Sequence, residues 1–400
     1  MLGDEPVVIA SAGEKLFDEA WESVRKHFYD KGLHGVDWDE VRTELGPRAR
    51  QAATRAEVSA IINAALDRLR ASHTRHYTPQ QREYYELLDV FFSEGVPERE
   101  GSALKPGPVE YVGIGLAAAR IEERVFVYDV YTGGPADAAG ILPGDELVGV
   151  EDGPWGDVEP FRGREGMPTR VKVRRERGGE TAEVVATPAR ISPRRLFLSA
   201  LREGARVHER DGKRIGYVRV RSYAHPCYHE ALRECLTEKL AEADALVLDF
   251  RGGWGGASPD YMDLFDPRAI PALTFGAEQR RYPSSPSKPV WSKPLAVLID
   301  GGTRSGKEVL AHAFKKHRLG TLVGGTTAGA VLGGGPHVLG DGSLLLLVGS
   351  DVRVDGEKLE GVGVEPDVPV ARLLPYSAGA DPQLERAFGV LTGRAAAPAP

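Results

Sequence analysis

The sequence predicts a multi-domain α/β protein, because three consecutive parts of the chain show three different patterns. Residues 13–100 carry apolar side chains at three- and four-residue steps, which indicates helices. Residues 108–190 contain short β-like runs separated by glycine turns, which indicates a small β-rich module. Residues 195–375 alternate between apolar strands and helical segments, which is typical of a βαβ-type sheet. Residues 376–400 are expected to form a tail, low in complexity at its end.

The N-terminal helical region rests on two apolar stripes. The first stripe comprises Phe17, Ala20, Trp21, Val24 and Phe28, and the second comprises Val58, Ile61, Ile62, Ala65, Leu66 and Leu69. Each stripe would cover one face of a helix. A polar stretch with Pro and Gly at 97–110 predicts a linker after these helices.

The strands of the next two regions are expected where apolar and β-branched residues cluster. In the β-rich module they are VFVYDVY, ELVGVED, TRVKVRR and AEVVATP, with one short helix at PADAAG. In the α/β region the expected strands are RIGYVRVRSY, DALVLDF, LAVLID, TLVGG, SLLLLVGSDVRV and VPVA. The helices there are PCYHEALRECLTEKLAEA and SGKEVLAHAFKKH.

Composition and charge exclude several classes of function. Hydrophobic residues make up 42% and charged residues 27% of the chain, as in a soluble globular protein. A net charge of -7 argues against a nucleic-acid binder, which usually carries a basic face. Apolar runs stay below the roughly 18 residues that span a bilayer, so no stable membrane insertion is expected. The sequence does not predict an oligomeric state.

Location and redox compartment follow only as conditional expectations. The first residues show no basic region followed by an apolar one, so no signal peptide is visible. The protein is expected to be periplasmic or secreted if an export signal has been removed, and cytoplasmic otherwise. Cys227 and Cys235 lie eight residues apart in a predicted helix, about 12 Å by helical rise, which is too far for a disulfide.

A glycine-rich turn at 301–307 allows three interpretations. It matches all but the last position of the phosphate-binding pattern G-x-x-x-x-G-K-[ST], which would make the protein a P-loop NTPase. Glu308 stands where that pattern needs Ser or Thr, and its carboxylate would repel phosphates. In the second interpretation, Ser305 is a nucleophile at a strand-to-helix turn, where free N–H groups can hold an oxyanion. In the third, Ser305 is only a helix cap.

Several separate motifs, in order along the chain, favour the nucleophile. They are YVGIGL, GGPADAAGILPGDELVGVEDGPW, RIGYVRVRSY, LVLDFRGGWGG, DGGTRSGKE and LEGVGVEPD. With them, residues 13 to about 372 resemble the S41 serine peptidases, the family of carboxy-terminal processing proteases and the tricorn core protease. The resemblance implies an N-terminal helical region, a PDZ-like domain at 108–190 and a ClpP/crotonase-like α/β core at 195–375. It also implies Ser305 as nucleophile, with no cofactor and no metal.

The resemblance also indicates which residue is the base. Processing proteases pair the serine with a lysine about two dozen residues later, but Ala330 occupies that place and no lysine lies between 317 and 357. Lys307 follows Ser305 by two positions, which do not face each other on a helix. The tricorn branch uses a Ser-His pair with a late Glu, and these match Ser72, His73 and Glu360. His76 is the alternative to His73, and Glu357 and Glu365 are the alternatives to Glu360. His73 could also be only a helix-end cation.

The resemblance further places the substrate-binding backbone. The N–H of Gly306 would form the oxyanion hole together with Gly255 and Gly256, while Arg251 would anchor this turn. Gly113, Ile114, Gly115 and Leu116 would line a PDZ-like loop that captures a peptide carboxylate. That module could instead be a scaffold that binds nothing. The possible zinc ligands His225, Cys227, His229 and Cys235 have a spacing that fits no paired metal motif, so they are expected to be ordinary helix residues.

These patterns together predict a serine endopeptidase that acts on peptides or proteins through an acyl-enzyme, with a His base rather than Lys. The first alternative is a lapsed protease scaffold that binds a peptide or another ligand. The second is the P-loop NTPase.

Overall fold

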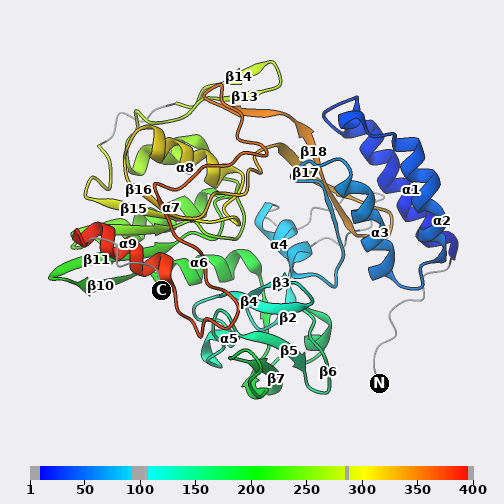
Figure 1. The fold of residues 1–400 in the computed structure, drawn as a ribbon, viewed down its shortest axis with the longest axis horizontal. Helices are drawn as coiled ribbons and strands as arrows, with labels where there is room; N and C mark the ends of the chain where they lie inside the picture. The colour runs from blue at the N-terminus through cyan, green and yellow to red at the C-terminus, as the bar shows by residue number, and fades with distance from the viewer. Residues whose placement is uncertain (1–9, 92–103, 105–106, 284–287, 395–400) are drawn as a thin grey trace. The chain divides into compact units, whose positions relative to one another are not determined.

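The computed structural model describes residues 10–91, 104, 107–283 and 288–394 (Figure 1). These residues form two compact units, each assembled from separate stretches of the chain. The first unit comprises Met1–Val109, Leu273–Arg280 and Ala330–Glu360, and the second comprises Glu110–Ala272, Arg281–Gly329 and Gly361–Pro400. Most of the linker predicted at 97–110 lies outside the described residues, as does the end of the predicted tail.

The helices of the first unit bury the two predicted apolar stripes. They are α1 (Ala10–His27), α2 (Trp38–Gln51), α3 (Arg55–Asp67) and α4 (Arg82–Phe91), with a short 3-10 turn at Leu33–Gly35. Thr54 caps α3 in a capping box with Glu57, which satisfies N–H groups at the helix start. Both stripes enter one hydrophobic core.

Strands also belong to the first unit, and this corrects two predictions. β1 (Arg75–Tyr77) lies in the region expected to be helical and pairs antiparallel with β18 (Leu344–Ser350). β17 (Gly333–Val338) completes that sheet, while β13 (Leu273–Phe275), β14 (Glu278–Arg280) and β19 (Val352–Val354) form another. The predicted core region 195–375 is therefore not contiguous. Leu345 and Leu347 of β18 pack into the core of the N-terminal helices, a pairing that local sequence cannot reveal.

The β-rich module lies in the second unit. Its antiparallel sheet has the order β3 (Leu116–Ile121), β4 (Arg124–Val130), β5 (Glu146–Val150), β7 (Thr169–Arg174) and β8 (Ala182–Ala186), and β6 (Gly153–Pro154) also belongs to it by pairing with β5. β2 (Tyr111–Gly113) pairs with β9 (Ala189–Ile191). The short helix α5 (Pro135–Ala138) and a 3-10 turn at Glu159–Phe161 lie between these strands in the chain.

A six-stranded sheet forms the rest of the second unit. Its order is β10 (Arg206–Arg210), β11 (Lys213–Arg219), β12 (Ala245–Asp249), β15 (Leu295–Ile299), β16 (Thr321–Gly324) and β20 (Val368–Pro369). All neighbours are parallel except β10 and β11. Every residue of β12 and β15 is buried, as a sheet covered on both faces requires.

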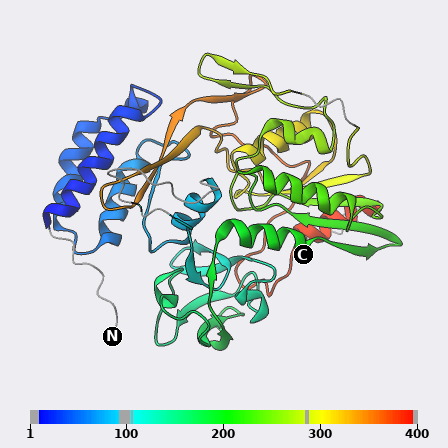
Figure 2. The same ribbon diagram turned by 180° about the vertical axis from the view of Figure 1, so that it is seen from behind.

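Helices cover both faces of this sheet. α7 (Pro226–Thr237) and α8 (Gly306–Lys316) connect parallel strands that follow one another in one direction, so right-handed crossovers place them on the same face. α9 (Pro382–Thr392) packs on the other face, and α8 and α9 lie on opposite sides of the strands in Figures 1 and 2. α6 (Pro193–Gly204) packs against α7, and a 3-10 helix spans Pro259–Leu264.

Helix α9 corrects the prediction that residues 376–400 form a tail. Asp381 caps its start, and Ala387, Phe388 and Leu391 enter the core beneath the six-stranded sheet. These residues recur at three- and four-residue steps, which is the helical signal that marked the N-terminal region. The tail was expected from the alanine- and proline-rich end of the chain, whereas the segment before it is amphipathic.

Candidate functional site

Ser305 stands in a strained turn between a buried strand and a helix. β15 ends at Ile299 and α8 begins at Gly306. The backbone of Ser305 has φ 56° and ψ −130°, which residues other than glycine rarely adopt. Such strain persists only where the surroundings enforce it, and it concentrates at active sites. A serine on a sharp strand-to-helix turn is also how hydrolases of other folds present a nucleophile.

Glu308 is the surrounding group that enforces this turn. Its buried carboxylate accepts hydrogen bonds from the N–H of Ser305 at 3.1 Å, from Thr327 Oγ1 at 2.6 Å and from the N–H of Gly329 at 2.7 Å. The residue that breaks the phosphate-binding pattern therefore ties the Ser305 turn to the loop after β16.

The side chain of Lys307 is not placed to bind a phosphate. Its side chain is fully buried, and its ammonium donates to the backbone carbonyls of Val220, Arg221 and Gly252. A P-loop lysine must instead reach the phosphates of a bound nucleotide. The geometry of this turn therefore argues against the P-loop NTPase interpretation.

The glycine turn after β12 lies against Ser305. A Cβ atom added to Gly255 would lie 2.4 Å from Cβ of Ser305, and one added to Gly256 would lie 2.4 Å from Cα of Ala224. A Cβ on Gly306 would lie 2.3 Å from the nitrogen of Ala257. No Cβ atom tolerates such contacts, so glycine at these positions allows the two turns to approach each other closely.

Backbone N–H groups remain available beside Ser305. Gly306 is the first residue of α8, so its N–H has no acceptor within the helix. Within the part of the chain that the structure describes, the N–H groups of Gly255 and Gly256 also make no hydrogen bond. The carbonyl of Gly255 accepts from the backbone N–H of Tyr223 at 3.0 Å, which fixes the orientation of this turn.

Arg251 anchors the glycine turn, as the sequence predicted. Its guanidinium is buried and bonds the carboxylates of Asp249 and Asp381, each at 2.7 Å, and the side chain of Gln383 at 3.0 Å. The turn is thereby joined both to strand β12 and to the start of α9.

Asp300 is a residue that sequence reasoning did not single out. Its carboxylate accepts from the N–H of Gly302 at 2.9 Å, from the N–H of Gly252 at 3.2 Å and from the Tyr128 hydroxyl at 2.6 Å. Arg372 adds an ion pair at 2.6 Å. Burial by itself would raise the pKa of Asp300, but Arg372 and Tyr128 hold this pKa below its usual value. An aspartate at the end of a fully apolar strand was the available signal.

The other predicted catalytic residues lie together in the first unit. Ser72 Oγ is 3.0 Å from His73 Nδ1 and 2.9 Å from Glu360 Oε2, and the N–H of Ser72 donates to Glu360 Oε1 at 3.0 Å. Glu360 also accepts from the N–H groups of Val331 at 2.9 Å and Leu332 at 3.3 Å. The structure thus brings Ser72, His73 and Glu360 into one chain of hydrogen bonds.

This chain of hydrogen bonds decides which nitrogen of His73 is basic. A serine hydroxyl has a single proton, and here it is donated to the carboxylate of Glu360. Ser72 Oγ must therefore accept a hydrogen bond from the N–H at Nδ1 of His73. The imidazole then carries its lone pair on Nε2, which is the nitrogen that can act as a base.

The alternatives to His73 and Glu360 have different surroundings. His76 is fully buried, with Nδ1 2.8 Å from Ser59 Oγ and Nε2 2.7 Å from Ser343 Oγ, and burial lowers its pKa to about 4. Both of its nitrogens are occupied by core hydroxyls, so His76 holds the core together. Glu357 and Glu365 are exposed, whereas Glu360 bonds Ser72.

The candidate zinc ligands have ordinary roles in and around α7. His225 caps this helix by accepting from the N–H of Cys227 at 3.2 Å. His229 stacks on Tyr261 at 4.2 Å and lies 3.1 Å from Asp263. Both cysteines are free thiols. Among the described residues, no three His, Cys, Asp or Glu side chains gather to form a metal site.

The predicted peptide-binding loop joins β2 to β3. Ile114 and Leu116 are buried, and the carbonyls of Ile114 and Gly115 accept from the N–H groups of Ala136 at 2.7 Å and Tyr131 at 3.1 Å. The loop is thereby fixed to the start of α5 and to the end of β4.

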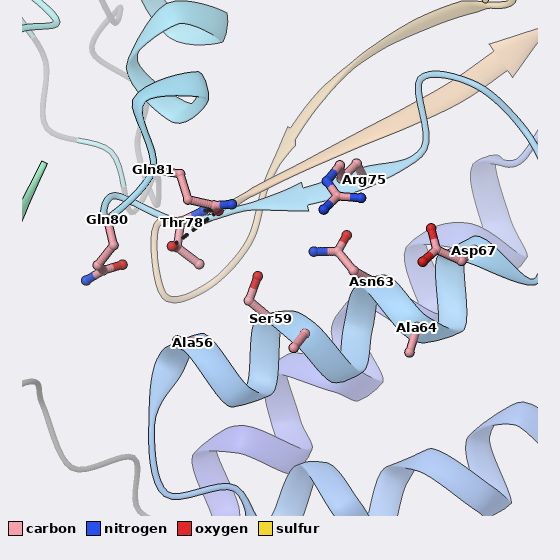
Figure 3. A pocket seen from close by; sticks show the side chains of 10 residues that line it. Ala56, Ser59, Asn63, Ala64, Asp67, Arg75, Thr78, Gln80 and Gln81 are labelled. Atoms are coloured by element: carbon pink, nitrogen blue, oxygen red, sulfur yellow. Dashed lines mark hydrogen bonds between the residues drawn. The ribbon is translucent and has the colours of Figure 1, made fainter. Parts of the chain in front are cut away.

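A pocket in the first unit contains none of the predicted site residues. Figure 3 shows it between α3 and the segment that includes β1, where it is lined by polar side chains such as Ser59, Asn63, Thr78 and Gln81. It lies beside His76 rather than His73, because Ser59 and Asn63 both bond His76. Across the described residues, no helix is long and apolar enough to cross a membrane.

Comparison with known proteins places this chain among proteases. Residues 214–370 match the model of peptidase family S41, and residues 13–67 match that of the tricorn protease C1 domain. The chain is 25% identical to the carboxyl-terminal-processing protease of Synechocystis, over 98% of this chain and 90% of that protein. It is also 25% identical to tricorn protease homolog 1 of Streptomyces coelicolor, over 95% of this chain but only 35% of that protein. The chain therefore spans about a third of the tricorn homologue.

A solved structure shares the fold. The photosystem II D1 C-terminal processing protease superimposes with a TM-score of 0.53 at 22% identity, covering 95% of this chain and 97% of that one. The mixed α/β multi-domain arrangement of this chain is thus also found in the D1 processing protease.

Proposed function

We propose that this serine-type peptidase, whose residues 214–370 match the model of peptidase family S41, cleaves internal peptide bonds through an acyl-enzyme on Ser305. The observation that carries this proposal is the strained backbone of Ser305, with φ 56°, at a turn against which Gly255 packs. A helix cap alone requires no such conformation.

We propose His73 as the base and Ser72 with Glu360 as the groups that orient it. Nε2 of His73 takes the proton of Ser305 Oγ while Oγ forms a bond to the substrate carbonyl carbon. The imidazolium then gives this proton to the amine as the C–N bond breaks. Water hydrolyses the acyl-enzyme by the same transfers in reverse. Ala330 stands where the processing proteases place a lysine, which favours the histidine.

The oxyanion would be held by the N–H of Gly306 together with the glycine turn at Gly255 and Gly256. Gly306 is the first residue of α8, so the positive end of the helix dipole lies at this site and favours a developing negative charge. Fixed donors of this kind act mainly on the transition state.

The β-rich module at 108–190 is proposed to be PDZ-like, and the region around the six-stranded sheet to have a ClpP/crotonase-like fold. On this proposal, residues 113–116 bind a peptide carboxylate, and a substrate strand adds to the module. Peptides and proteins are the proposed substrates.

Labelling with a fluorophosphonate tests the nucleophile and the base. We expect an adduct on Ser305, located by mass spectrometry, no adduct in Ser305→Ala, and labelling at least ~1,000-fold slower in His73→Ala with an unchanged circular dichroism spectrum. Imidazole in the buffer should partly restore labelling of His73→Ala. Sequencing the fragments of an unfolded protein substrate would show internal cuts.

A folded wild-type protein that takes no label would instead support a lapsed scaffold. Full labelling of His73→Ala would remove His73 from the mechanism while leaving Ser305 in place.

A further inference from the structure

Lys307 carries a buried amine that has no acidic partner among the described residues. Its side chain has no exposed surface, and among the described residues no carboxylate lies within ion-pair distance of its Nζ. Its three partners are all backbone carbonyls: those of Val220 and Arg221 at 3.4 Å each, and that of Gly252 at a shorter distance. Burying a charge without a counter-ion is costly, and here only hydrogen bonds to backbone carbonyls offset that cost.

These carbonyls belong to the two segments that frame the oxyanion donors. Val220 and Arg221 continue strand β11 beyond its last residue, Arg219, and Gly252 opens the glycine turn after β12. The carbonyl of Arg221 also accepts from the N–H of Trp254 at 2.7 Å. Lys307 therefore bonds the glycine turn directly and also bonds the segment with which this turn pairs.

Two residues on either side of Ser305 hold the peptide groups of Gly252. The N–H of Gly252 donates to Asp300 Oδ1 at 3.2 Å, and its carbonyl accepts from Lys307 Nζ. Asp300 and Lys307 flank Ser305 in sequence. Three residues after Gly252 is Gly255, whose Cα approaches Ser305 so closely that a Cβ would overlap it.

We infer that Lys307 is a positioning residue, which holds the glycine turn Gly252–Gly256 in register with Ser305 so that its N–H groups stay aimed at the oxyanion. This inference rests on the proposed function of Ser305, Gly306 and the glycine turn. Lys307 itself touches no substrate, because its Nζ lies in the interior among backbone carbonyls.

Burial lowers the pKa of Lys307 to about 7, and the nearby Arg219 adds to this effect. Charged and neutral amines both carry N–H donors, so the connection to Gly252 persists in either state.

The decisive experiment compares fluorophosphonate inactivation of wild-type protein with that of Lys307→Met. Methionine keeps an unbranched apolar chain but has no donor. We expect the maximal inactivation rate to fall about 10- to 100-fold while the half-saturating concentration stays within about twofold, because oxyanion donors act on the chemical step. Lys307→Gln, which retains the N–H donors of a side-chain amide, should recover part of the rate.

Lys315→Met is the matched control. Lys315 lies on the same helix, and its Nζ also donates to a backbone carbonyl, that of Glu365 at 2.7 Å, but it is 40% exposed and bonds neither turn. Its inactivation rate should equal that of the wild type. Thermal unfolding of all variants reports separately on stability.

Three outcomes would overturn the inference. They are a folded Lys307→Met with the wild-type inactivation rate, a loss confined to the half-saturating concentration, and failure of both Met and Gln variants to fold, which would make Lys307 a general stability residue. If wild-type protein takes no label at Ser305, the proposed function fails first. Normal wild-type labelling with an unaffected Lys307→Met removes only the role of Lys307.

Discussion

Two histidines three residues apart show how the surroundings of a side chain set its chemistry. His73 bonds Ser72 through Nδ1, and Ser72 in turn bonds Glu360, so its basic nitrogen is Nε2. His76 has core hydroxyls on both nitrogens and no exposed surface. The sequence offered both as candidate bases, and their hydrogen-bond partners favour His73.

His76 predicts a specific dependence of stability on pH. Burial lowers its pKa from 6.5 to about 4, although Asp341 opposes this shift and Arg55 adds to it. Between these two values the unfolded chain binds a proton that the folded protein does not, so the free energy of unfolding rises with pH over this window. By linkage, about 3 kcal/mol should be lost on going from pH 7 to pH 4.

Urea unfolding at several pH values from 4 to 7 measures this effect. His76→Gln has no imidazole to protonate, so its stability should be lower at pH 7 but less dependent on pH. Equal slopes for the variant and the wild type would show that other groups cause the acid sensitivity.

At the level of elements, local patterns predicted the strand, turn and helix that carry Ser305. β15 is a continuous apolar run, and α8 follows a glycine turn, so both signals lie within 22 residues. The pairing of β1 with β18 joins residues about 270 positions apart. Such a pairing depends on which surfaces meet after folding, so no local pattern encodes it.

The motif resemblance supplied what local patterns could not. It selected Ser72, His73 and Glu360 from separate segments, and the structure brings these three into one hydrogen-bonded chain. It did not select Asp300 or Lys307, because their roles arise from buried contacts with backbone groups of the glycine turn.

The close approach of two turns gives a prediction at the level of elements. Gly255→Ala places a methyl group 2.4 Å from Cβ of Ser305, so one turn must move away from the other. We expect fluorophosphonate labelling to fall about 100-fold or more, as when an oxyanion donor is lost. Gly301→Ala is the control, since a Cβ there meets no atom within 4 Å. Equal labelling of both variants would contradict the proposed place of the oxyanion donors.

At the scale of the whole molecule, each compact unit is built from three separate stretches of the chain. Residues 273–280 and 330–360 join the helical unit, although segments of the second unit flank both of them in sequence. Glu360 is the last residue of the segment 330–360. Because this segment belongs to the helical unit, Glu360 can accept a hydrogen bond from the N–H of Ser72, which lies 288 positions earlier in the chain. The order of motifs along the chain therefore does not mirror the division into compact units.

Within the second unit, buried ion pairs join the β-rich module to the six-stranded sheet. Asp129 of β4 bonds Arg219 of β11 at 2.9 Å and Arg221 at 2.7 Å. Burial by itself would raise the pKa of Asp129, but the two arginines lower it below its usual value. Arg221 also presents its carbonyl to Lys307 and Trp254, so this connection leads directly to the glycine turn.

Asp129→Ala should therefore destabilise the protein strongly. Removing the carboxylate leaves the buried guanidinium of Arg221 without its anion and leaves Arg219 with the more distant Asp249, at 3.9 Å. Breaking a buried ion pair in this way typically costs about 3–5 kcal/mol. Asp152→Ala is the control, because Asp152 belongs to the same module but is 92% exposed, where ion pairs contribute little. Guanidinium unfolding at pH 7 measures both variants.

The pH dependence offers a second check on Asp129. A carboxyl group whose pKa is lowered by folding stabilises the folded state above its unfolded pKa, and this contribution is lost as pH falls through the folded value. The gap in stability between wild type and Asp129→Ala should thus be largest near neutral pH and narrow in acid. A gap that stays constant down to acid pH would mean that the variant loses packing rather than charge. A gap that is absent at every pH would show that the module is held to the sheet by its apolar contacts alone.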